Sequence, residues 1–158
     1  MKKLFVPVAA CLFFACGNNK ADQPADTGDT TLAPTHFIWQ SALNDSTGKL
    51  ELMPSWEIDP DSLQPAMVIG QLNRTNQQTG YGKISLVFVK TSGDTVYLQI
   101  PDATYLTQQM GSTGPRLFLS GLVYTLSSLP GINYVNLDME EGDHAGPGTY
   151  SRESFKDE

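Results

Sequence analysis

Residues Gly111–Asp138 read GSTGPRLFLSGLVYTLSSLPGINYVNLD, and this stretch decides the fold of the chain. Pro115 suits the first position of a helix, where the amide hydrogen that it lacks would have no partner. Large apolar side chains then recur at helical spacing over Leu117–Leu129, in a stripe wide enough to cover a sheet. Pro130-Gly131 ends the helix, and alternating residues typical of a strand follow. The stretch therefore predicts a helix that packs on a sheet and leads into one of its strands.

Gly121 interrupts this helix with a residue that costs about 1 kcal/mol relative to Ala in a helix interior. We expect a close approach of the helix backbone to the sheet to compensate for that cost. The strand after the helix, Val135–Met139, alternates apolar with polar residues, which predicts one buried and one exposed face.

A β-hairpin precedes the helix. Residues Ile84–Val89 are apolar on both faces, as expected of a central strand, and Ser92-Gly93-Asp94 forms the turn. Val96–Ile100 alternates as the returning strand. The next segment, Ala103–Met110, fits either a helical turn or a loop.

The first part of the domain predicts two strands. Phe37–Trp39 is aromatic and β-branched, and the turn formers Asn44–Gly48 follow it. Leu50–Ile58 alternates in part, but Pro54 cannot donate to a central ladder, so this strand is predicted to be irregular or at a sheet edge.

A further helix is predicted to begin within Asp59–Ser62, whose side chains can accept the free amide hydrogens of a first turn. Pro65 is tolerated there only if it lies in that first turn. The apolar residues that follow lie on more than one side of the helix, and the polar glycine-containing segment Thr75–Gly82 predicts a loop.

Together these elements predict an α+β fold, with a small mixed sheet of about five strands and two helices on one face. The core domain is predicted to span residues 36–142, and residues 143–158 are predicted to be a polar tail. No internal repeat is visible.

The N-terminus predicts export and lipidation. Lys2 and Lys3 precede an apolar run, Leu4–Phe14, that is too short to span a bilayer, which is typical of a signal peptide. The run ends in Ala15-Cys16-Gly17, which resembles a bacterial lipobox, so residues 1–16 are interpreted as the signal and Cys16 as the lipidated residue. Residues 17–35 are polar and acidic and are expected to be a flexible tether.

Charge and cysteine content limit the chemistry of the mature protein. The chain carries 10 basic and 17 acidic residues, a net charge of −7, and the signal would remove two of the lysines. Such a surface repels nucleic acid, so no nucleic-acid partner is expected. Cys11 leaves with the signal and Cys16 takes the lipid, so neither a disulfide nor a cysteine metal site is expected in the domain.

At the level of family, Gly111–Gly142 resembles the C-terminal half of the GerMN domain, the sporulation and spore germination module. The similarity is strongest in Val123-Tyr124-Thr125-Leu126 and in Pro130-Gly131, and it extends to the hairpin arm GDTVYLQIPD and to LELMPSWEI. It covers Phe37–Gly142 and departs from the family pattern at QQTGYGK and in the C-terminal tail.

The resemblance implies a non-enzymatic, membrane-anchored, extracytoplasmic domain related to ring-building motifs, without catalytic residues or cofactors. An envelope protein or a second copy of the chain is the expected partner, at the periplasmic or cell-surface side of an outer membrane. The alternative is a lipoprotein that binds a glycan or a peptide fragment. A small hydrolase would require a cleft that brings a histidine to a serine or a carboxylate.

Three groups of residues are candidate sites. Ser112, Thr113 and Arg116 stand at the start of the helix and can contact a phosphate or carboxylate there, but a plain helix start is the favoured interpretation of these residues. His144 lies near acidic residues in a spacing that matches no known metal ligand set, so no metal site is expected. Four aromatic residues can pack in the core or line a groove for a glycan or peptide: Trp39, Trp56, Tyr81 and Tyr97.

Overall fold

The computed structural model describes residues 35–156. The predicted signal, Cys16 and nearly all of the tether lie outside these residues. Six strands and two α-helices make an α+β fold, which confirms the predicted class. The strands form two separate sheets, one of two strands and one of four, and not the single sheet of about five strands that the sequence suggested.

The two-stranded sheet pairs β1 (His36–Leu43) with β2 (Leu50–Ile58) in antiparallel register. The carboxamide oxygen of Asn44 accepts the amides of Ser46 and Thr47 and thereby fixes the turn between them. The register shifts between Ile38 and Trp39, where Trp39 pairs with Pro54. The prediction of an irregular edge strand around Pro54 is confirmed.

The helix α1 (Pro65–Gln78) begins later and ends later than the sequence suggested. The predicted start at Asp59 caps a separate 3₁₀ turn, η1 (Pro60–Ser62), in which the Asp59 side chain accepts the Asp61 amide at 2.9 Å. Pro65 occupies the first turn, as required. The predicted loop Thr75–Gly82 is present but begins at Thr79, because the helix continues to Gln78. The expectation of burial on more than one side was wrong, because the buried residues form one stripe: Val68, Ile69, Leu72 and Asn76.

The four-stranded sheet has the order β3 (Val87–Ser92), β4 (Thr95–Ile100), β5 (Tyr134–Met139) and β6 (Gly148–Tyr150). β4 and β5 are parallel, and the other pairs are antiparallel. The sheet is therefore mixed, as predicted. The β3–β4 hairpin also confirms its prediction, with Gly93 at a φ of 59° in the turn.

β3 lies at the edge of its sheet, so the prediction of a central strand was wrong. Ile84 and Leu86 are buried, but they precede the strand and pack under α1. The side chain of Asn73 holds this segment by bonding both the amide and the carbonyl of Leu86 at 2.8 Å. Within β3 itself, Val87 and Val89 are exposed.

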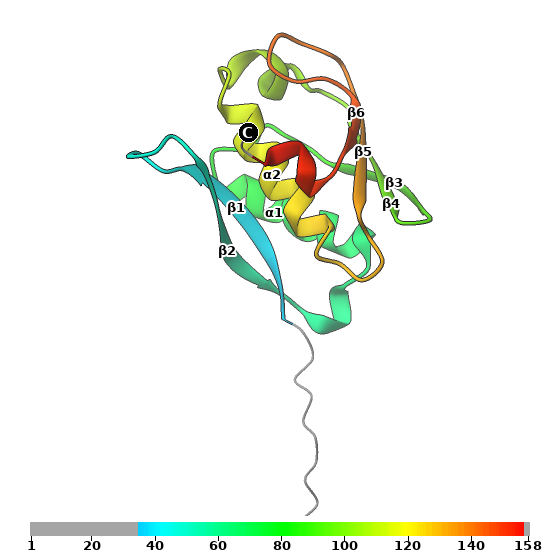
Figure 1. Ribbon diagram of the computed structural model, residues 1–158. Coiled ribbons are helices and arrows are strands. Elements are labelled where there is room, and N and C mark those ends of the chain that lie inside the picture. Colours follow the sequence, from blue (N-terminus) through cyan, green and yellow to red (C-terminus); the bar gives the residue numbers. More distant parts are fainter. Residues whose placement is uncertain (1–34, 157–158) are drawn as a thin grey trace, which may run out of the picture. The chain divides into compact units, whose positions relative to one another are not determined.

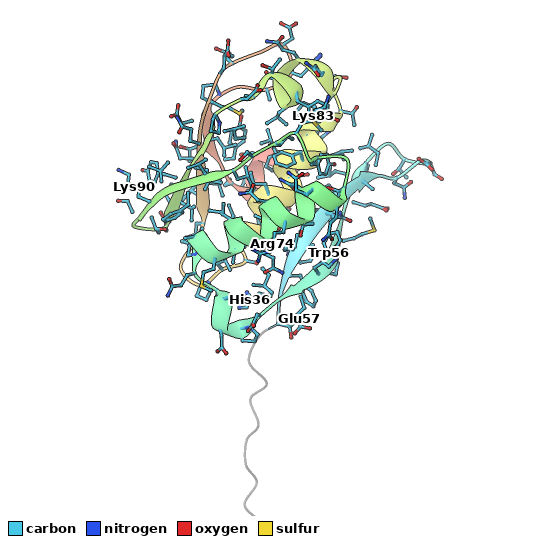
Figure 2. The ribbon with its side chains drawn as sticks, turned by 180° about the vertical axis from the view of Figure 1, so that it is seen from behind. His36, Trp56, Glu57, Arg74, Lys83 and Lys90 are labelled. Carbon is cyan, nitrogen blue, oxygen red and sulfur yellow. The ribbon has the colours of Figure 1, made fainter. Side chains whose placement is uncertain are left out.

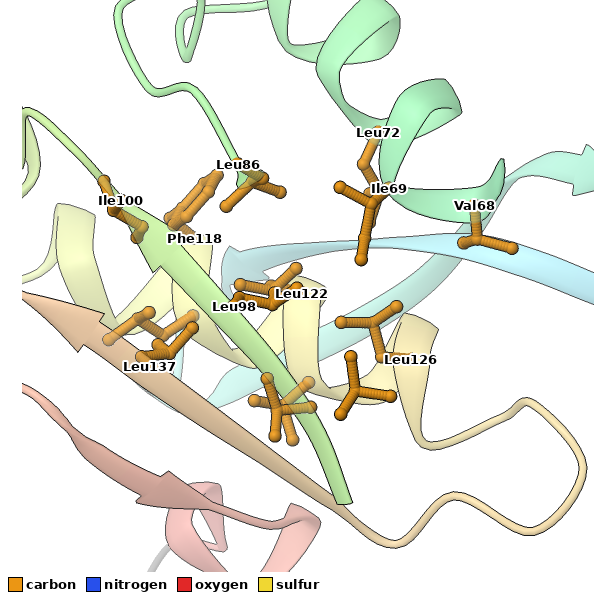
Figure 3. Close-up of a cluster of buried hydrophobic side chains, with 14 of the residues drawn as sticks. Val68, Ile69, Leu72, Leu86, Leu98, Ile100, Phe118, Leu122, Leu126 and Leu137 are labelled. Atoms are coloured by element: carbon orange, nitrogen blue, oxygen red, sulfur yellow. The ribbon is translucent and has the colours of Figure 1, made fainter. Parts of the chain in front are cut away.

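The helix α2 (Gly114–Leu126) lies between the two sheets (Figure 1). On one side, Phe118 and Leu122 of α2 join a cluster of apolar residues from α1 and the four-stranded sheet, including Leu98 (Figure 3). The other side packs against β1, where a Cβ placed on Gly121 would stand 2.8 Å from the Trp39 carbonyl oxygen. The expected close approach at Gly121 is confirmed, although the partner is the two-stranded sheet. The prediction of a single sheet is thus corrected to two sheets with α2 between them. The prediction of two helices on one face is confirmed, because α1 and α2 both pack against the buried face of the four-stranded sheet.

The remaining segments close the core. The segment Ala103–Met110, for which the sequence allowed either a helical turn or a loop, contains the π-helix η2 (Tyr105–Gln109). The predicted polar tail contributes strand β6 and a short 3₁₀ helix, η3 (Arg152–Phe155), and Phe155 is buried. Among the described residues, no helix is both long and apolar enough to cross a membrane.

Candidate functional site

An open groove of about 450 Å³ lies between the two-stranded sheet and the segment that follows α1. We call it the tyrosine groove. Its walls come from four segments that are distant in sequence, which the fold brings together: Gln40, Ser41, Ala42, Met53, Thr79, Gly80, Tyr81 and Tyr105. A volume of this size is typical of small-molecule sites.

One wall of the tyrosine groove is held by Tyr105. Its hydroxyl donates to the carbonyl oxygen of Gly80 at 3.2 Å, which ties η2 to the loop after α1. The ammonium of Lys83 lies 4.9 Å from the centre of the Tyr105 ring, a cation–π contact that also fixes the ring. Lys83 lies near the top of the molecule in Figure 2. These contacts set the wall before any ligand arrives.

Tyr81 lies at the inner side of the tyrosine groove. Its ring packs edge-on against buried Phe118, with centroids 5.2 Å apart. Burial raises the pKa of the Tyr81 phenol above its ordinary value of 10.0, and the nearby Tyr105 adds to the shift. Tyr81 is therefore neutral near pH 7, and its hydroxyl can donate a hydrogen bond.

A second, smaller cavity of about 30 Å³ adjoins the groove, and Gln40, Ser41, Thr79 and Tyr81 line both. The rest of its lining is mostly apolar and comes from the core, including Leu72, Leu86 and Leu122. Trp39 also lines the cavity, and its indole nitrogen is buried without a hydrogen-bond partner in the described part of the chain.

The predicted anion site lies at the start of α2. Ser112, Thr113 and Arg116 are near one another in sequence and all exposed. Neither Thr113 nor another side chain caps the helix. Arg116 already has an interaction partner. Contact of these residues with an anion stays a prediction.

The histidines stand apart from the groove. His36 begins β1, and His144 is exposed in the loop after β5, where its amide donates to the Thr107 carbonyl oxygen at 3.1 Å. Neither histidine lines the tyrosine groove. Within residues 35–156, no group of three or more His, Cys, Asp or Glu side chains is arranged to hold a metal ion.

The four predicted aromatic residues do not share one groove. Tyr81 lines the tyrosine groove, Trp39 packs edge-on against Tyr124 with centroids 6.4 Å apart, and Trp56 is exposed on β2. Tyr97 lies on the other sheet beneath Lys90, whose ammonium is 4.8 Å from the ring centre. Figure 2 shows Trp56 and Lys90 on opposite sides of the molecule.

Sequence reasoning missed Gln40, Met53 and Tyr105 as groove residues. Tyr105 lies in the segment whose structure was left open, and Met53 precedes the proline of an irregular strand. No spacing rule connects four segments that meet only in the folded chain, so the sequence held no signal that could have found them.

The outer face of the four-stranded sheet is a second surface of interest. Cross-strand pairing places one row of side chains across all four strands: Lys90, Tyr97, Asn136 and Thr149. Tyr134 and Val87 lie on neighbouring rows and are exposed. The residues that alternate with these, such as Leu98 and Leu137, are buried in the core.

Comparison with known proteins gives two solved structures of similar outline. Tandem GerMN domains of the sporulation protein GerM from Bacillus subtilis match with a TM-score of 0.48 and 15% identity, over 81% of this chain and 48% of that one. A protein described as a "Putative Lipoprotein" from Clostridium perfringens matches with a TM-score of 0.40 and 17% identity, over 78% of this chain and 95% of that one. The chain thus spans about half of the tandem structure.

No family model matches the sequence, and no curated protein matches it. The GerMN domains among the structural neighbours are the family that the sequence resembles.

Proposed function

We propose that this protein is a lipid-anchored, extracytoplasmic GerMN-like domain that acts by contact with an envelope protein and not by catalysis. The lipobox-like Cys16 and the acidic segment after it support the anchor and the tether. The contact itself is assigned to the outer face of the four-stranded sheet.

The composition of that face is the observation that carries the proposal. Across its central rows lie two tyrosines, an exposed valine, Thr and Asn side chains, one lysine and one aspartate. Its one lysine and one aspartate balance each other, whereas the chain as a whole has 17 acidic residues against 10 basic ones. Tyrosine enrichment is typical of protein interfaces.

The sheet edges favour contact through the face over strand addition. β3 carries a register shift between Phe88 and Lys90, and its exposed bulge residue is Val89. β6, at the other edge, has only three residues. Bulges and short strands are devices that hinder edge-to-edge pairing.

Photocrosslinking in living cells tests the contact. A photoreactive phenylalanine analogue at Tyr97 of the full chain should give a specific crosslinked protein, identified by mass spectrometry. The same group at the exposed Asp61, in η1 and away from this face, is the matched control. Crosslinks that are absent at Tyr97 and at Tyr134, or that are the same at Asp61, would refute the assignment of the face.

The anchor has its own test. Cys16→Ser should move the protein from the membrane fraction to the soluble fraction and abolish labelling by a clickable fatty acid. A variant that keeps both membrane location and label would refute lipidation at Cys16, and this result is independent of the crosslinking.

A further inference from the structure

We propose that the tyrosine groove, with the cavity behind it, binds a saccharide that carries an N-acetyl group. This site uses neither Cys16 nor the outer face of the four-stranded sheet. A failure of sugar binding would therefore not refute the function proposed above, and a failure of that function would not refute sugar binding. The sugar ring would lie in the groove, and the methyl of its acetamido group would enter the cavity.

The lining of the groove suits a neutral sugar. Tyr81 and Tyr105 offer aromatic surface and Met53, 47% exposed, offers flexible apolar surface, on which the C–H groups of a pyranose can pack. Gln40, Ser41 and Thr79 add uncharged groups that can both donate and accept. None of the eight lining residues is Asp, Glu, Lys or Arg. A charged ligand would therefore lose water without gaining an ion pair from the lining.

Two of these polar groups have unused bonding capacity. The carboxamide oxygen of Gln40 accepts from the Ser55 hydroxyl at 3.0 Å, while its nitrogen has no protein partner among residues 35–156. The Tyr81 hydroxyl likewise makes no hydrogen bond within the described chain, and its raised pKa keeps it a donor. A ligand that brings acceptor oxygens to this wall would use both.

The cavity would make the site prefer a sugar with an acetyl group over a sugar without one. At about 30 Å³ it is too small for a sugar ring but large enough for one methyl-sized group. Most of its lining is apolar, including Leu72, Leu86 and Leu122, and this part favours a methyl over a hydroxyl, because a hydroxyl against it would lose its hydrogen bonds to water.

A pair of trisaccharides tests the proposal, because they differ in the acetamido group alone. Protein purified in mild detergent from cells that express the full chain is titrated with triacetylchitotriose and, separately, with cellotriose, and followed by ¹⁵N NMR. Triacetylchitotriose should shift the side-chain signals of Gln40 and Trp39 at millimolar or lower concentration, and cellotriose should bind at least tenfold more weakly.

Two substitutions sharpen the test. Tyr81→Phe keeps the ring against Phe118 and removes only the hydroxyl, so triacetylchitotriose should bind about fivefold more weakly, the value of one hydrogen bond. Thr75→Leu enlarges a half-buried side chain that lines the cavity but not the groove. The larger side chain should fill the space for the methyl group, so that the two sugars bind with about equal affinity. Tyr97→Phe, on the distant sheet, is the control and should change nothing.

Several results would overturn the proposal. No binding of triacetylchitotriose, equal binding of cellotriose by the unaltered protein, or shifts confined to residues outside the groove would each do so. Binding of an uncharged tripeptide in the groove with higher affinity than the sugar would assign the site to peptides instead. The amide spectrum of each variant without ligand shows whether it is folded, so a misfolded variant is replaced by Gln40→Leu, which removes the free carboxamide nitrogen and should weaken binding similarly.

Discussion

The two sides of α2 hold their sheets by different chemistry. Toward the four-stranded sheet the helix presents large aliphatic and aromatic side chains, such as Phe118 and Leu122, which are held by the burial of apolar surface. Toward β1 it presents Ser120, Gly121 and Thr125, which allow the strand backbone to approach closely. One helix therefore joins one sheet by burial of apolar surface and the other by short directional contacts.

The polar side is a small network. The Thr125 hydroxyl accepts the Trp39 amide at 2.9 Å and donates to the Gly121 carbonyl at 2.7 Å. Ser120 and Ser41 share a hydrogen bond of 2.7 Å between their hydroxyls. The Trp39 amide bonds to the helix and not to a strand, so α2 covers the open edge of β1.

The largest effect should come from the aliphatic side. Leu122→Ala removes a nearly fully buried side chain and leaves a cavity, so the free energy of unfolding should fall by about 2–5 kcal/mol. Urea unfolding followed by circular dichroism measures the change. A loss smaller than that from the polar side would show that area does not dominate the attachment of α2.

Thr125→Val should come next, with a loss of about 1–3 kcal/mol, because it leaves the Trp39 amide without a partner in a buried position. Thr125→Ser keeps the hydroxyl and is the matched control, with a clearly smaller loss expected. Equal losses for the two variants would mean that the methyl group, and not the hydrogen bond, is what matters at this position.

Two helical glycines give the third comparison. Gly121→Ala should destabilise by about 1–2 kcal/mol, because the new Cβ would meet the Trp39 carbonyl oxygen at 2.8 Å, a backbone atom that cannot move aside cheaply. Gly70→Ala in α1 meets only the flexible Arg74 guanidinium at 3.7 Å and should stabilise by up to about 1 kcal/mol. Stabilisation in both variants would contradict the close approach of α2 to β1.

The smallest expected effect on stability comes from two partly buried tyrosines, Tyr81 and Tyr150. Burial raises the pKa of both Tyr81 and Tyr150 above the ordinary 10.0. The unfolded chain therefore releases these protons first as the pH rises, and stability that is fully present below pH 10.0 is lost as the pH passes through the folded-state pKa values. Urea unfolding on both sides of pH 10 should show this fall, and the double variant Tyr81→Phe and Tyr150→Phe should reduce it. An unchanged fall would assign the effect to other groups.

The difference between the two sides of α2 also explains what the sequence could predict. The aliphatic periodicity of α2, the β3–β4 hairpin turn and the alternation of β5 are local patterns, and all three predictions were confirmed. The division into two sheets was not predicted, because it depends on small polar residues of α2 meeting β1, and such residues have no periodic signature. β6 and the burial of Phe155 were missed because a short polar segment whose two aromatic residues, Tyr150 and Phe155, lie five positions apart gives no strand pattern.

The same reasoning applies to the candidate sites. The start of α2 could be located from a local glycine, serine and proline pattern, and the structure places Ser112, Thr113 and Arg116 there. The tyrosine groove could not be located, because Gln40, Met53, Tyr81 and Tyr105 come together only through tertiary packing.

The hydrogen bond from Trp39 to Thr125 joins residues 86 positions apart. Until α2 has been synthesised and has formed, the β1–β2 hairpin lacks the surface that covers its open edge, and a two-stranded hairpin alone is at best marginally stable in water. Contacts of such long sequence separation slow folding, because the chain loses the entropy of closing the loop before the contact repays it. When the chain emerges with its N-terminus first, the β1–β2 hairpin therefore stays exposed until α2 has followed it. The first strands to emerge are thus among the last to reach their stable packing.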